Sequence, residues 1–128
     1  MQRAWWIAVF IVTVVGIDAR SIQGPALANV MRQKLSHSQS ILEAVVTSNW
    51  TALDTETRAL ERLTTDPRWT VLKSPEYAAH SAAFVKAVQD LGRAAEQRNL
   101  ENTPKAYVEM TLKCVECHRY LARARIAR

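Results

Sequence analysis

Two cysteines and a histidine near the C-terminal end of the chain form the sequence Cys114-Val115-Glu116-Cys117-His118. On an α-helix, positions i, i+3 and i+4 share one face, so both thiols and the imidazole point the same way. C-x-x-C-H is the signature of c-type haem attachment, in which two thioether bonds hold the porphyrin and the histidine reaches the iron. The spacing therefore predicts one covalent haem c on Cys114 and Cys117, with His118 as the proximal iron ligand.

Other uses of this pair of cysteines agree less well with the sequence. A thioredoxin-like redox pair belongs beside a βαβ pattern, which this sequence does not show. A zinc site needs a fourth ligand at a credible spacing, and none is apparent. A disulfide is the ordinary expectation for an exported chain. The two-residue separation and the adjacent His118 favour haem attachment instead.

Four amphipathic segments are expected to form the helices that position this motif. We expect helices over residues 25–46, 50–65 and 75–97, and from 104 to near the C-terminus. Three glycines and 48% hydrophobic residues also favour long helices over a turn-rich β protein. Mostly short connections predict an all-α fold, an antiparallel up-down-up-down four-helix bundle with the haem on its C-terminal helix. One cytochrome domain is expected over residues 20–128.

Each expected helix has an apolar stripe for the core. The stripes are Leu27, Met31, Leu35, Leu42 and Val45; then Leu53, Thr57, Leu60 and Leu63; then Tyr77, His80, Phe84, Val88, Leu91 and Ala95; and finally Tyr107, Met110, Cys114, Cys117, His118 and Leu121. Capping residues are expected at Ser48 or Asn49, at Ser74 and at Thr103. The apolar residues of the loop before Ser74, namely Trp69, Val71 and Leu72, are expected to fold over one end of the bundle.

The N-terminal residues predict export from the cytoplasm. Arg3 precedes an apolar run of thirteen residues, 5–17 (WWIAVFIVTVVGI), which suits a signal sequence better than a membrane span of about 20 residues. We expect residues 1–19 to form an export signal cleaved near Ala19, with cleavage after Ala28 or an uncleaved anchor as alternatives. The domain is then periplasmic, and it meets the membrane only if the anchor is retained.

Charge and composition exclude other functions. The formal net charge is +5, and two haem propionates would offset about two of those charges. No recognisable nucleic-acid motif and no basic patch interleaved with aromatic residues is present, so nucleic acid is not an expected partner. No acid–base constellation suits an enzyme. The basic residues near the C-terminus instead suit the dipole at the end of a helix.

The chain resembles the cytochrome c′ family, including its low-spin, methionine-ligated relatives. The resemblance covers about residues 25–125 and rests on residues 31–35 (MRQKL), 74–77 (SPEY) and 114–118 (CVECH). It implies that the last helix supplies the proximal histidine and that a first-helix residue faces the other side of the haem. The sequence departs from the family where an aromatic and a basic residue often follow the histidine, because Leu121 and Ala122 stand there. Family members often dimerise, which makes a homodimer a candidate assembly.

The sixth iron ligand decides the expected function. The family places the distal residue at Met31, and His/Met coordination raises the reduction potential and favours electron transfer. Methionine on an apolar face is otherwise core packing, and His80 is the alternative ligand. The expected function is single-electron transfer between redox partner proteins. If Met31 does not ligate, the alternative is a five-coordinate protein that binds nitric oxide or carbon monoxide; a peroxidase-like role would need His80 as distal base.

Overall fold

The computed structural model describes residues 20–70 and 72–124, and the expected signal at residues 1–19 lies outside this part. The described residues form four α-helices and one 3₁₀ turn: α1 (Arg20–Thr47), α2 (Trp50–Leu63), η1 (Pro67–Trp69), α3 (Pro75–Glu96) and α4 (Asn102–Arg123). No strand occurs among them. The prediction of an all-α four-helix bundle is therefore confirmed at this level. Within the described residues, no helix is long and apolar enough to cross a bilayer.

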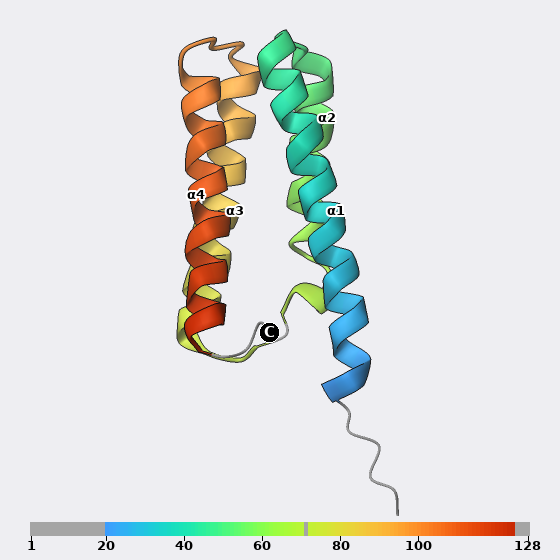
Figure 1. Ribbon diagram of the computed structural model, residues 1–128. Coiled ribbons are helices and arrows are strands. Elements are labelled where there is room, and N and C mark those ends of the chain that lie inside the picture. The colour runs from blue at the N-terminus through green and yellow to red at the C-terminus, as the bar shows by residue number, and fades with distance from the viewer. Residues whose placement is uncertain (1–19, 71, 125–128) are drawn as a thin grey trace, which may run out of the picture.

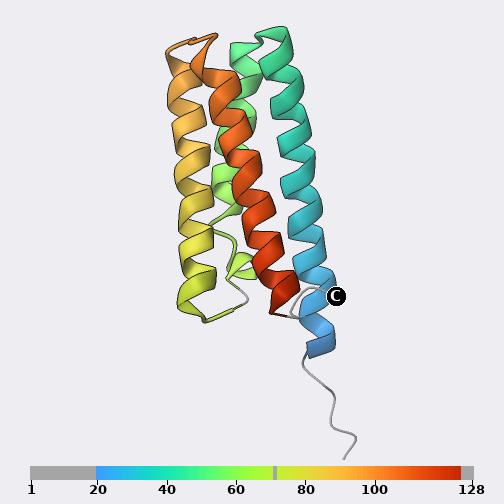
Figure 2. The same cartoon turned by 60° about the vertical axis from the view of Figure 1, so that its left-hand side comes forward.

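The helices pack in the order in which they follow one another along the chain. Extensive contacts join α1 to α2, α2 to α3 and α3 to α4, while α1 touches α4 only sparsely. Figure 1 shows α1 and α2 on one side of the bundle and α3 and α4 on the other. Figure 2 shows α4 passing in front, between α3 and α1. The first and last helices thus border a seam that is less closely packed than the rest.

The core is built from large apolar side chains of all four helices. Its fully buried members include Phe84, Ile41, Leu53, Leu60, Leu91 and Met110. Trp69 of η1 closes one end, because its ring stacks on Phe84 with 5.6 Å between the ring centroids. Its indole Nε1 donates a hydrogen bond to Ser81 Oγ over 3.2 Å. The prediction that Trp69 folds over the end of the bundle is therefore confirmed, whereas Val71 lies outside the described residues.

Two of the three expected helix caps are present. The side chain of Asn49 accepts a hydrogen bond from the amide of Ala52, and that of Ser74 accepts one from the amide of Tyr77. The cap expected at Thr103 is wrong. The helix begins one residue earlier, at Asn102, whose amide donates to the side chain of Asn99, and Thr103 is buried with no partner for its hydroxyl among the described residues.

The buried face of α1 differs from the predicted stripe. Val30, Lys34, Ile41 and Ala44 are buried, whereas Leu35 and Leu42 are 58% and 45% exposed. The helix is therefore rotated relative to the prediction, so that a lysine takes a core position. The stripe expected for α2 is confirmed, since Leu53, Thr57, Leu60 and Leu63 are its buried residues.

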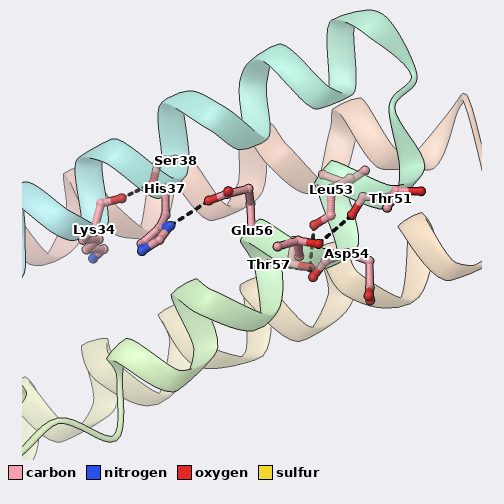
Figure 3. A network of polar contacts seen from close by, with 9 residues as sticks. Lys34, His37, Ser38, Thr51, Leu53, Asp54, Glu56 and Thr57 are labelled. Atoms are coloured by element: carbon pink, nitrogen blue, oxygen red, sulfur yellow. Dashed lines mark hydrogen bonds and ion pairs between the residues drawn. The ribbon is translucent and has the colours of Figure 1, made fainter.

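A polar contact on the outer side of the bundle fixes α1 against α2. His37 Nδ1 lies 2.7 Å from Glu56 Oε2, and both side chains are partly exposed. Figure 3 shows His37 reaching from α1 toward Glu56 on α2. Because His37 is engaged on this side, it is directed away from the α1–α4 seam.

Candidate functional site

A groove runs along the seam between α1 and α4. At one point the seam is closed, where Tyr107 Oη on α4 donates a hydrogen bond to the carbonyl oxygen of Ser38 on α1 over 3.2 Å. The adjoining groove has a volume of about 400 Å³ and a mainly apolar surface, and both helices contribute to its walls. Its size lies in the range of small-molecule and cofactor sites, about 300–1,000 Å³.

The groove brings together residues from opposite ends of the sequence. Met31 of α1 lines it, together with Cys114 and His118 of α4. Cys117 is half-buried on the same helix but is not part of the groove wall. Three of the four residues proposed to hold a haem thus share one cavity, and the fourth lies one helical turn from Cys114.

Both cysteines of the signature are free thiols. The Cys114 thiol donates a hydrogen bond to the carbonyl oxygen of Met110, one turn earlier, over 3.4 Å. Burial raises the pKa of the Cys117 thiol, while the charge of Lys34 opposes this shift. Two uncombined thiols at i and i+3 on one helix are suited to forming two bonds to one flat group.

His118 lies at the rim of the groove and is exposed. Loss of water around part of its ring lowers the pKa of His118, and the positive charge of Lys34 lowers it further. Both effects favour the neutral imidazole at neutral pH. That is the form in which histidine binds metals.

Lys34 is a site residue that the sequence did not predict. It lines the groove with Met31, Cys114 and His118, yet only 7% of its surface is exposed. Burial lowers the pKa of Lys34, and the nearby Cys114 and Cys117 oppose this shift. A signal was present in the sequence, since position 34 lies one helical turn from Val30 and two turns from Ile41, on the stripe that the structure buries.

His80 lies away from the groove. It lines a separate hollow with Glu116, Arg119, Tyr120 and Arg123, and its ring centroid is 5.1 Å from that of Tyr120. The hydroxyl of Tyr120 is in turn 3.0 Å from Ser74 Oγ, at the start of α3. The structure therefore places His80 on a different side of α4 from Met31.

The residues of the groove suit a haem better than a bare metal ion. Among the described residues, no three His, Cys, Asp or Glu side chains gather closely enough to hold a metal ion. A haem brings its own four nitrogen ligands, so it needs only one or two axial ligands from the protein. An apolar groove with the Cys114 thiol and a neutral imidazole on one wall, the Cys117 thiol one turn away on the same helix, and the Met31 thioether on the other wall meets those needs.

Comparisons of the chain with protein-family models, with curated proteins and with solved structures find no match.

Proposed function

We propose that this chain is a monohaem c-type cytochrome that carries single electrons outside the cytoplasm. The observation that carries the proposal is that Met31, Cys114 and His118 line one apolar groove between the first and last helices. Met31 and Cys114 lie on different helices, and the fold brings them to one cavity. In this proposal the helices run antiparallel, up-down-up-down, and α4 carries the cofactor.

Each residue of the groove has a distinct part in the proposal. Cys114 and Cys117 hold the haem through thioether bonds and so keep it from dissociating. His118 is the proximal ligand, supplied by the neutral form of its imidazole. Met31, which lines the groove from α1, would supply a thioether sulfur as the second axial ligand. A haem with these ligands supplies reversible one-electron chemistry, with a potential raised by the methionine.

The surrounding fold contributes rigidity and exclusion of water. The groove walls are mainly apolar, so they limit the entry of water to the redox centre and lower the local dielectric. Phe84 and Met110, which are nearly or fully buried, belong to the core that fixes the positions of α3 and α4. A rigid site changes little between oxidation states, which favours fast electron transfer to a redox partner protein.

The test is expression of the full chain in a bacterium with the machinery for c-type cytochrome maturation. The expected result is covalent haem, detected by its absorption in denatured protein, in the wild type. We expect no covalent haem in Cys114→Ala/Cys117→Ala. A matched control, Val115→Ala/Glu116→Ala, alters the two middle positions of the motif and should retain the haem.

Spectra of the folded protein separate electron transfer from gas binding. Low-spin bands and no rapid change on adding carbon monoxide support a sixth ligand and electron transfer. A high-spin spectrum that changes at once with carbon monoxide would replace this proposal by a five-coordinate, gas-binding protein. Absence of covalent haem in the wild type would reject both.

A further inference from the structure

Lys34 places a positive charge inside the bundle. Its Nζ atom lies 3.6 Å from the centroid of the Phe84 ring and 4.7 Å from that of Trp69. Aromatic faces attract cations, and the attraction strengthens where water is excluded. The two rings therefore fix the end of the Lys34 side chain at one place between α1, α3 and η1.

The charge of Lys34 has no carboxylate partner within the described part of the chain. None of the ion pairs there includes Lys34. A buried charge is costly unless it is paired, and two aromatic rings compensate for it only in part. The positive charge of Lys34 thus favours the binding, in the groove, of a group that is negatively charged or that becomes more negative on reduction.

The same charge acts on the residues of the haem signature. Lys34 lines the groove with Cys114 and His118, and its electrostatic influence extends to Cys117. Water screens such interactions weakly where both groups are partly buried. A redox group attached to these residues would therefore feel the charge of Lys34.

We propose that Lys34 is a tuning residue of the groove, whose buried ammonium group favours the reduced state of a haem bound there. This inference rests on the proposed function. Reduction adds one electron and removes one unit of positive charge from the iron, so a neighbouring cation stabilises the reduced state relative to the oxidised state. Lys34 thereby raises the reduction potential, without itself binding the iron.

The test compares reduction potentials of the full-length holoprotein. Lys34→Met removes the charge and shortens the unbranched side chain by one atom. Lys34→Gln is a second neutral variant, which brings no thioether into the groove. Lys34→Arg keeps the charge. Lys86→Met is the control for net charge. Lys86 is exposed on α3, pairs with Asp90 and does not line the groove, so this variant changes the net charge by the same amount at another place. Potentials are measured by optical titration at one pH and one salt concentration.

The expected result is a lower potential in Lys34→Met and Lys34→Gln, with values near the wild type in Lys34→Arg and Lys86→Met. Equal potentials in all proteins, with haem attached, would overturn the tuning role and leave the proposed function intact. A change from low-spin to high-spin iron in Lys34→Gln, which introduces no thioether, would also overturn it, because Lys34 would then be a ligand. Absence of covalent haem in the wild type would reject the proposed function and this inference together.

A second measurement needs no haem. In the Cys114→Ala/Cys117→Ala chain, Lys34→Met should raise the urea concentration at the midpoint of unfolding, because it removes a buried charge without a carboxylate partner. A lower midpoint would contradict the premise that the aromatic rings compensate for the charge only in part in the haem-free chain. Lys86→Met in the same background should leave the midpoint nearly unchanged.

Discussion

The hydroxyl of Tyr107 and the carbonyl oxygen of Ser38 form a hydrogen bond of 3.2 Å between residues 69 positions apart in the sequence. It joins the last helix to the first across a seam where the two helices otherwise touch little. Ser38 and Tyr107 are both among the residues that line the groove. The contact therefore holds α1 and α4 together at the proposed haem site.

Tyr107→Phe removes this hydrogen bond and keeps the ring. The Ser38 carbonyl then loses a partner, so we expect the free energy of unfolding to fall by about 1 kcal/mol. Urea denaturation followed by circular dichroism measures the change. Thr55→Val serves as control, because the Thr55 hydroxyl bonds only to a carbonyl of its own helix on the surface. An unchanged stability in Tyr107→Phe would show that the seam does not depend on this bond.

Met31→Ala tests the sixth ligand. If the Met31 thioether binds iron, its loss should convert low-spin iron to high-spin and open the site to carbon monoxide. Leu35→Ala is the matched control, since Leu35 lines the same groove and has no atom that can bind iron. Optical spectra of both holoproteins provide the measurement. A low-spin spectrum in Met31→Ala would remove Met31 from the ligand set.

Ser74→Ala removes the N-terminal cap of α3. The Ser74 hydroxyl accepts a hydrogen bond from the amide of Tyr77 and lies 3.0 Å from Tyr120 Oη. Loss of such a cap costs about 1 kcal/mol of stability. Thermal unfolding should therefore show a lower midpoint for Ser74→Ala, while Ser74→Thr, which keeps a hydroxyl, should stay close to the wild type. Equal midpoints for Ser74→Ala and the wild type would contradict a capping role.

Asp66 gives the stability a dependence on acid pH. Hydrogen bonds from the side chain and the amide of Arg68 lower the pKa of Asp66 to about 2 from an ordinary value of 3.8. Because the pKa of Asp66 is lower in the folded state, the ionised carboxylate stabilises the fold. This contribution to the free energy of unfolding is present above the unfolded-state pKa of 3.8 and is lost as the pH falls through the folded-state pKa of about 2. The stability difference between the wild type and Asp66→Asn should therefore shrink between about pH 4 and pH 2. Urea denaturation at several pH values checks this; a constant difference would contradict it.

The helices were predictable because their ends and stripes have local causes. Ser74-Pro75 begins α3 as expected, and Leu53 and Leu60 mark the buried face of α2. The prediction for Thr103 is wrong because the Asn99 side chain accepts from the amides of Glu101 and Asn102, and the helix already begins at Asn102, which puts Thr103 inside its first turn. Local signals thus determine where helices lie but do not decide between two neighbouring caps.

The orientation of α1 could not be predicted from its own residues. A count of apolar positions selects Leu35 and Leu42, yet these are exposed while Lys34 is buried. The lysine is accommodated because Phe84 and Trp69, from other parts of the chain, provide aromatic faces for its ammonium group. Such compensation depends on tertiary contacts. The spacing of Cys114, Cys117 and His118 could be interpreted from sequence because it depends on one helix alone.

The sparse seam between α1 and α4 also bears on how the chain folds. Nearly all close packing joins helices that are neighbours in the sequence, so most native contacts have a short separation along the chain. Proteins with such low contact order fold in microseconds to milliseconds, because little loop-closure entropy is lost before contacts form. The contact between Tyr107 and Ser38, which joins residues 69 positions apart, is then among the last to form. A haem-free chain would thus reach a nearly complete fold while its first and last helices can still separate.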